Sequence, residues 1–373
     1  MFLTTRHDVT ITLLPEGERS EPNRCEELLQ RYQNIVEQGR LNWTPHLRFE
    51  EVVGSGGQGV VFRTEWRGAD AFTIPVAVKV FSPERYDTPR SYDEAMQRLA
   101  GVAGRVAQIQ HDHLLGVHNW VDRDRIRMMV MELIDGFDLQ RLLSPGLFLK
   151  TKASVSRERW EHLNRVVITE GPTHPRIKAG VAVAIVRDCL AGLAALHREG
   201  IIHGDVKPSN VMLKRTGIAK LIDIGAAYSV DDPPPCRSCT PSYAAPEVLE
   251  GAAVNARSDL ASLGYVLIEM LSGQPIFAQY ASYRELLEAK RNLGQRLHDL
   301  LPPEVSCNDL LMDFCRGLVA YDPSKRFPSA EDAEMKQNGA AAFHRQLVMG
   351  DLASEYDNDL RVWIDELKSL DFS

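Results

Sequence analysis

The chain has 373 residues, of which 44% are hydrophobic and 25% are charged, and its formal net charge is −8 at pH 7. This length exceeds one ordinary hydrophobic core and predicts two lobes or domains of a soluble globular protein. An acidic surface repels phosphates, so we expect no nucleic acid among the partners. The sequence contains no run of about 18 apolar residues, which predicts that no helix spans a membrane.

The start of the chain and its cysteines both favour a cytoplasmic location. The first residues lack the basic-then-apolar order of a signal peptide, and the six cysteines are mostly scattered, as expected for reduced thiols. One pair differs, because Cys236 and Cys239 form a CxxC motif. Such a pair suits redox chemistry or half of a zinc site, but no second CxxC completes a set of four ligands.

The predicted elements change in type along the chain. Residues 1–48 form an N-terminal extension with a strand and a helix, and residues 49–134 are rich in strands with one helical stretch at 92–110. Helices dominate residues 135–340. This order predicts an α+β fold with a small β-rich N-lobe and a larger helical C-lobe.

Two later segments carry opposite charge. The insertion at about 144–179 has a local net charge of +4 between Lys150 and Lys178. It is interpreted either as a solvated loop or as a docking surface for an acidic partner. The acidic tail, residues 341–373, is predicted to be helical, with Leu360, Trp363, Leu367 and Leu370 on one face that packs on the body of the protein. A further hypothesis is that this acidic helix docks near the basic insertion.

A glycine-rich turn lies between two apolar runs near the start of the N-lobe. Gly54, Gly56 and Gly59 have the spacing of dinucleotide-binding turns, but a strand follows them where such turns have a helix. We therefore expect a β-hairpin whose backbone N–H groups approach phosphate oxygens. Lys79 follows in the strand VAVKV, where a buried ammonium group requires an anion.

Four polar side chains follow in two short loops of the C-lobe. Asp205, Lys207 and Asn210 lie in HGDVKPSN, and Asp223 comes directly after an apolar strand. Asn210 and Asp223 offer the oxygen ligands that Mg²⁺ prefers. Asp205 can then orient a hydroxyl nucleophile, while Lys207 neutralises charge on a moving phosphoryl group.

In this order and spacing the motifs resemble the eukaryotic-type (Hanks-type) Ser/Thr protein kinase superfamily, in particular its bacterial members, over about residues 48–340. The resemblance implies ATP as a substrate, with Mg²⁺ as the metal and Mn²⁺ as a substitute. It implies a glycine-rich loop at Gly54–Gly59, an ATP-binding Lys79, a catalytic base at Asp205 assisted by Lys207, and metal ligands at Asn210 and Asp223. It also implies that Asp259 steadies the catalytic loop and that Arg326 pairs with Glu247 of the APE motif.

The same resemblance assigns an adenine pocket. Met131 would be the gatekeeper, backbone groups of Glu132 and Ile134 would meet adenine, and Asp138 would bind ribose. Val61, Ala77 and Met212 would sandwich the adenine ring, with plain core packing as the alternative for these three.

The sequence departs from the family at three places. HGD lacks the usual arginine before Asp205, Gln58 replaces the aromatic residue often found at the loop tip, and Glu94 is the nearby glutamate that could pair with Lys79. Glu94 lies about two helical turns early, so either a longer helix brings it to Lys79 or the pair is missing.

The predicted function is a protein Ser/Thr kinase, because Lys207 and Thr240 match that class. Its partner is then a protein substrate. Two alternatives stay open: a pseudokinase or scaffold that uses the fold for binding, and a small-molecule kinase of the same superfamily.

Overall fold

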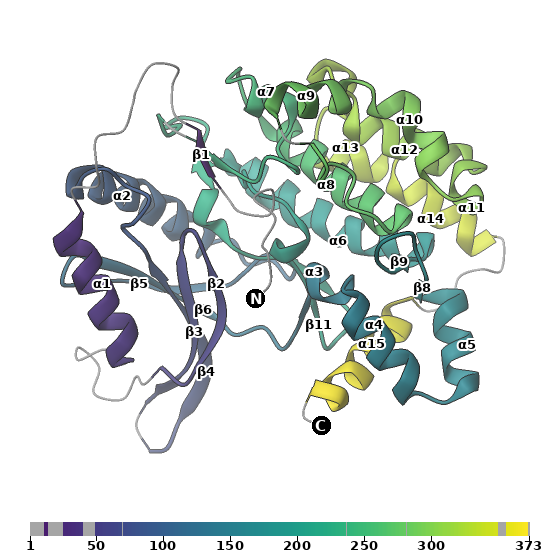
Figure 1. Ribbon diagram of the computed structural model, residues 1–373. Coiled ribbons are helices and arrows are strands. Elements are labelled where there is room, and N and C mark those ends of the chain that lie inside the picture. The colour runs from purple at the N-terminus through teal and green to yellow at the C-terminus, as the bar shows by residue number, and fades with distance from the viewer. Residues whose placement is uncertain are drawn as a thin grey trace.

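The structure is a computed structural model that describes residues 11–13, 25–39, 49–68, 70–235, 237–280, 282–349 and 356–371. The described chain forms two lobes, with a β-sheet in the N-lobe and mostly helices in the C-lobe (Figure 1). The N-lobe sheet is antiparallel with strand order β2-β3-β4-β6-β5. Its strands are β2 (Glu51–Gly56), β3 (Gly59–Arg67), β4 (Thr73–Phe81), β5 (Val117–Arg123) and β6 (Ile126–Glu132). The predicted α+β fold is confirmed.

Two helices accompany this sheet. Helix α2 (Pro89–Val106) begins three residues before the predicted stretch, because Thr88 and Ser91 form a reciprocal capping box and a proline occupies the first turn. Its buried face includes Met96, Leu99 and Val102. Helix α1 (Glu26–Gln38) belongs to the N-terminal extension and packs against β6.

The C-lobe is built around α6 (Ala179–Arg198) and α8 (Ala256–Ser272), which pack against each other. Among the described residues, α6 alone is long and apolar enough to cross a membrane, but most of it is buried against α8 and other helices, as in a core helix. Other C-lobe helices include α3 (Leu139–Leu142), α7 (Pro246–Leu249), α9 (Tyr283–Arg291), α10 (Leu293–Leu300), α11 (Pro303–Ser306), α12 (Asp309–Val319), α13 (Ala330–Met335) and α14 (Ala340–Met349).

Short antiparallel strands hold the loops that carry polar residues. Strand β11 (Val211–Lys214) pairs with both β12 (Ala219–Leu221) and β7 (Gly136–Asp138), and β10 (Ile201–Ile202) pairs with β13 (Tyr228–Ser229). The HGDVKPSN loop therefore runs between β10 and β11, and Asp223 lies two residues after the end of β12. Pairing on both sides fixes where these two loops start and end.

One pairing joins segments that lie far apart in the sequence. Strand β1 (Ile11–Leu13) of the N-terminal extension pairs antiparallel with β14 (Arg237–Cys239), with Thr12 opposite Ser238. The other parts of the extension, residues 1–10, 14–24 and 40–48, and the predicted CxxC partner Cys236, lie outside the described residues. Cys239 is a buried free thiol.

The basic insertion contains helices and not a solvated loop. Helices α4 (Pro145–Ser154) and α5 (Arg157–Val166) begin after Ser144 and Ser156, whose hydroxyl groups accept hydrogen bonds from backbone N–H groups of the first turn. Two short strands, β8 (Ile168–Thr169) and β9 (Arg176–Ile177), complete the segment. The capping residues explain why the chain becomes helical at these points.

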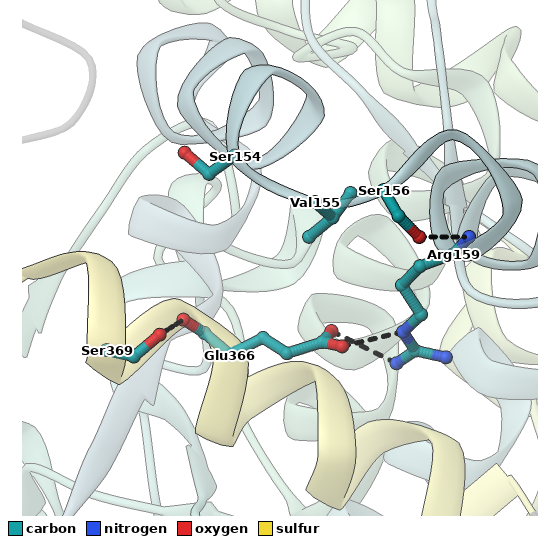
Figure 2. Close-up of a pocket in the computed structure, with 6 residues that line it drawn as sticks. All are labelled: Ser154, Val155, Ser156, Arg159, Glu366 and Ser369. Carbon is teal, nitrogen blue, oxygen red and sulfur yellow. Dashed lines mark hydrogen bonds and ion pairs between the residues drawn. The ribbon is translucent and has the colours of Figure 1, made fainter.

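The acidic tail contacts this insertion. Helix α15 (Tyr356–Asp371) lies beside α4 and α5 (Figure 1) and buries Leu360, Trp363 and Leu367, as predicted; the side chain of Leu370 lies outside the described set. Figure 2 shows Arg159 of α5 facing Glu366 of α15 across the two hydrogen bonds that join them, of 2.7 and 3.1 Å. An acidic segment that contacts the insertion is thus part of the same chain.

A cavity of about 360 Å³ lies between this insertion and the tail (Figure 2). Its lining comprises Ser154, Val155, Ser156, Arg159, Glu366 and Ser369. None of these residues belongs to the predicted nucleotide or catalytic set, so the cavity is separate from the candidate site.

Candidate active site

The glycine-rich turn is the tip of the β2–β3 hairpin, as predicted. Gly54 pairs with Val61 and Gly56 pairs with Gly59 across the hairpin. Gly59 has a φ of +141°, and a Cβ atom there would lie 1.9 Å from the carbonyl oxygen of Val80 on β4. Only glycine fits this close approach of two backbones. The hairpin tip is thereby pressed against the strand that carries Lys79.

Lys79 lies near the end of β4, opposite Val61 on β3, and is 4% exposed. Its Nζ donates to Asp223 Oδ1 at 2.5 Å and to Gln58 Oε1 at 2.7 Å. An ion pair between Lys79 and Asp223 thus joins the two lobes, although the sequence assigns these residues to the phosphates and to the metal. The second partner is Gln58. The sequence marks it as an unusual residue at the loop tip and does not predict a contact with Lys79.

The predicted pairing of Lys79 with Glu94 is wrong in this structure. Glu94 lies on the solvent side of α2, where Arg90 donates to it at 2.8 Å. The helix begins at Pro89, so Glu94 falls in the second turn on the face opposite the buried Met96 and Leu99. Helical phase therefore directs this carboxylate away from the sheet.

Asp223 is held in a left-handed conformation, with a φ of +61°, and its Oδ1 also accepts from the Gly225 N–H at 3.0 Å. Burial by itself would raise the pKa of Asp223, but the charge and hydrogen bond of Lys79 outweigh it and lower the pKa to about 2. The carboxylate is therefore ionised at neutral pH, which is the form that binds a cation.

The catalytic loop brings its predicted residues together in one buried cluster. Asp205 Oδ1 accepts from the Thr240 hydroxyl group at 2.7 Å and from the Thr240 N–H at 3.0 Å. Lys207 Nζ lies 2.8 Å from Asp205 Oδ2 and donates to Thr240 Oγ1 at 2.9 Å. Asn210 Nδ2 donates to the Asp205 carbonyl oxygen at 2.8 Å. This network fixes the orientation of the Asp205 carboxylate.

Asp259 holds the backbone of this loop by hydrogen bonds, as predicted. Its two carboxylate oxygens accept from the His203 N–H and the Gly204 N–H, each at 2.9 Å. His197 Nε2 lies 2.9 Å from the same carboxylate. Burial opposes the charged form, but the contacts with His197 and the loop lower the pKa of Asp259 below its ordinary value. An ionised, buried carboxylate thus holds the backbone immediately before Asp205.

Comparison with known proteins assigns these features to one family. The sequence matches the protein kinase domain over residues 47–337, which is more than half of the chain. This chain belongs to the protein kinase family.

Its relatives include bacterial Ser/Thr kinases. Serine/threonine-protein kinase PknD of Mycobacterium tuberculosis is 28% identical over 303 residues, covering 79% of this chain and 40% of PknD. Serine/threonine-protein kinase PkaA of Streptomyces coelicolor is 31% identical over 298 residues, covering 76% of this chain and 48% of PkaA. The chain therefore matches less than half the length of these relatives.

A solved structure shows the same fold. The kinase domain of PknI from Mycobacterium tuberculosis superposes with a TM-score of 0.52 at 20% sequence identity, covering 83% of this chain and 98% of that domain. The bilobal kinase fold is thus shared along most of the chain.

In this kinase, the segment between Asp223 and the APE motif is anchored by buried charges. Arg326 donates to both carboxylate oxygens of Glu247, at 2.6 and 2.8 Å, as predicted. Lys290, which the motifs did not indicate, is 1% exposed and donates to the Ser242 carbonyl oxygen at 2.8 Å. Burial lowers the pKa of Lys290 well below its ordinary value, and the rings of Tyr265 and Phe277 lie about 4 Å from its Nζ.

The expected hinge of the kinase joins β6 to β7. Met131 is buried opposite Ala77 in the sheet, and Met212 lies opposite Asp138 in the β7–β11 pair. The Asp138 carboxylate caps α3 by accepting from the Arg141 N–H at 2.9 Å, and burial raises its pKa.

Glu132 and Ile134 follow at the end of β6 and just beyond it. The Glu132 side chain accepts from the Gly116 N–H at 2.6 Å and pairs with Lys220. These contacts, and not adenine, occupy its carboxylate. The prediction for Glu132 concerned its backbone and is compatible with this arrangement.

Proposed function

We propose that this chain is a protein Ser/Thr kinase that transfers the γ-phosphoryl group of ATP to a Ser or Thr hydroxyl group of a protein substrate. The observation that carries the proposal is the buried cluster of Asp205, Lys207, Asn210 and Thr240, together with the Lys79–Asp223 ion pair. Family membership and the Ser/Thr kinases among the relatives support it. A cytoplasmic location remains part of the proposal.

Each residue has a part in the transfer. Lys79 would bind the α- and β-phosphates, and adenine would lie between Val61 and Ala77 above and Met212 below. The substrate hydroxyl oxygen forms a bond to the γ-phosphorus as the bond from that phosphorus to the bridging oxygen of ADP breaks. The proton of the hydroxyl group passes to the Asp205 carboxylate. Lys207 stabilises the charge that develops on the phosphoryl group.

The donor set fits Mg²⁺. Asn210 uses its Nδ2 for both of its hydrogen bonds to Asp205, so neither bond involves Oδ1. Asp223 supplies an ionised carboxylate. When bound, the metal neutralises phosphate charge. Two protein ligands completed by phosphate oxygens and water are typical of Mg²⁺. Within the described part of the chain, no group of three or more His, Cys, Asp or Glu residues is placed to hold a metal alone.

A mass-spectrometric transfer assay tests the proposal. The wild type and Asp205→Ala are incubated with Mg·ATP and a mixture of Ser/Thr-containing and Tyr-containing peptides. We expect phosphoserine or phosphothreonine with the wild type and a loss of at least about 1,000-fold in the variant, with ATP binding retained. Transfer by both proteins at the same rate, or to tyrosine alone, would contradict the proposal.

A pseudokinase or scaffold is the second candidate, and one observation favours it. Within the described residues, α2 brings no carboxylate to Lys79, because Asp93 pairs with Arg125 and Arg127 while Glu94 pairs with Arg90. Binding of Mg·ATP without measurable transfer would favour this candidate. A small-molecule kinase is less well supported, because Arg326 and Lys290 anchor the segment on which a peptide substrate would rest.

A further inference from the structure

Lys79 meets two oxygen acceptors, and neither comes from helix α2. One is Asp223 of the C-lobe, and the other is the side-chain carbonyl oxygen of Gln58 at the tip of the glycine-rich hairpin. Both acidic side chains of α2 have arginine partners elsewhere, as described above. The N-lobe acceptor for Lys79 is thus a neutral carboxamide.

The structure holds Gln58 in this position from several sides. Its side chain is buried, with 8% of the residue exposed, although the hairpin residues before it are mostly exposed. Its backbone carbonyl oxygen accepts from the Ser82 N–H at 2.9 Å, which ties it to the end of β4. The next residue, Gly59, is pressed against the Val80 carbonyl oxygen. A side chain on a backbone fixed in this way has few directions open to it.

The other side of Gln58 packs against the loop that carries Asp223. A Cβ atom built on Gly225 would lie 1.9 Å from Gln58 Oε1 and 2.9 Å from Asp223 Oδ1. Gly225 therefore leaves the space into which the carboxamide reaches. The glycine-rich hairpin, β4 and the C-lobe therefore meet at one point, where Lys79 of β4 bonds to both Gln58 and Asp223.

We propose that Gln58 is the positioning residue for Lys79, taking the part that the sequence predicts for Glu94. The inference rests on the proposed function, in which Lys79 binds the nucleotide phosphates. Gln58 and Asp223 accept two of the three protons of the ammonium group, and the third would be donated to a phosphate oxygen of the bound nucleotide. A neutral acceptor also places no extra negative charge beside the phosphates, where a carboxylate at close range would oppose their binding.

Binding measurements separate this role from a merely structural one. The full chain is titrated calorimetrically with Mg·ATP and, separately, with adenosine, which lacks phosphates. Because a hydrogen bond to a charged group is worth about one to two powers of ten in binding, we expect Gln58→Ala to bind Mg·ATP about 10-fold more weakly. Adenosine affinity should stay within about twofold, which also shows that the variant is folded.

A second variant and a control sharpen the test. Gln58→Glu restores an acceptor and should give an ATP affinity and a kcat/KM between those of the wild type and Gln58→Ala. Gln97→Ala makes the same chemical change at an exposed site on α2 and should leave both ligands unaffected. Where transfer is measurable, kcat/KM for ATP should fall in Gln58→Ala by the same factor as ATP affinity or more.

Several results would overturn the inference. Unchanged ATP affinity in Gln58→Ala would show that Lys79 does not depend on the carboxamide, and tighter binding would show that the carboxamide competes with the phosphates. Equal loss of ATP and adenosine binding would indicate a structural role alone. A wild type that binds Mg·ATP but transfers no phosphate would refute the proposed function. The ATP affinities of the wild type and Gln58→Ala would still test the role of Gln58. A wild type that binds no Mg·ATP would overturn both.

Discussion

Trp363→Ala should release helix α15 from the C-lobe and strongly destabilise the kinase. Trp363 is 1% exposed, and its neighbours Leu360, Ile364 and Leu367 are equally buried. Truncating a buried tryptophan to alanine costs about 3–5 kcal/mol, against a typical total stability of about 5–15 kcal/mol. The Arg159–Glu366 pair is partly exposed and contributes about 0–1 kcal/mol, so it cannot hold the helix alone.

The assay is urea unfolding followed by circular dichroism, with limited proteolysis of the tail as a second measurement. Trp363→Phe is the matched control. The indole Nε1 is buried and has no hydrogen-bond partner within the described residues, so phenylalanine removes an unsatisfied group along with part of the ring. We expect Trp363→Phe to remain within about 1 kcal/mol of the wild type. If Trp363→Ala unfolded at the same urea concentration as the wild type, with the tail still resistant to protease, burial of this ring would not be what docks the helix.

Three further changes test separate contacts. Glu94→Gln should alter phosphate transfer by less than about twofold, since Glu94 pairs with Arg90 on the surface; a loss of 10-fold or more would return Glu94 to the partnership with Lys79. Arg326→Ala should lower the free energy of unfolding by about 3–5 kcal/mol because it leaves the Glu247 carboxylate buried and unpaired, and a loss below about 1 kcal/mol in urea unfolding would contradict this. The pKa of Asp223 lies at about 2, below its ordinary 3.8, so its ion pair contributes about 2 kcal/mol that is fully present above pH 4 and lost as the pH falls through 2. The stability advantage of the wild type over Asp223→Asn should therefore shrink between pH 4 and pH 2, and a constant difference would argue against the ion pair.

Much of the site could be predicted from local patterns because each residue has a fixed place relative to a strand. Lys79 lies within β4, Asp223 lies two residues after the end of β12, and the loop of Asp205 and Asn210 leads into β11. Pairing of β11 with β12 brings the loop of Asp205 and Asn210 close to Asp223, whereas Lys79 reaches Asp223 from a separate sheet through its side chain. The two lobes were also predictable, because a strand-rich unit precedes a helical one along the chain.

Two of the remaining features had a signal in the sequence, and a third had none. The direction of Glu94 depends on the phase of α2, which the Thr88–Pro89–Ser91 cap sets, and that cap was a legible signal. Ser144 before Pro145 was a similar signal for α4, which was expected as a loop. The inward turn of Gln58 leaves no pattern in the sequence, because side-chain direction at a hairpin tip is set by the strand it packs against.

The two halves of the site are held by different kinds of contact. Asp205 is fixed within the C-lobe, since its backbone neighbours bond to the buried Asp259 and its carboxylate bonds to Thr240. Lys79 is held by one contact from each lobe, and its N-lobe contact comes from Gln58 on a hairpin whose preceding strand is exposed. A change in how this hairpin closes would therefore move an acceptor of Lys79 while leaving the base in place. Under the proposed function, the hairpin is then the part of the site that can adjust its contact with the nucleotide phosphates, while the C-lobe network holds Asp205 in a fixed position.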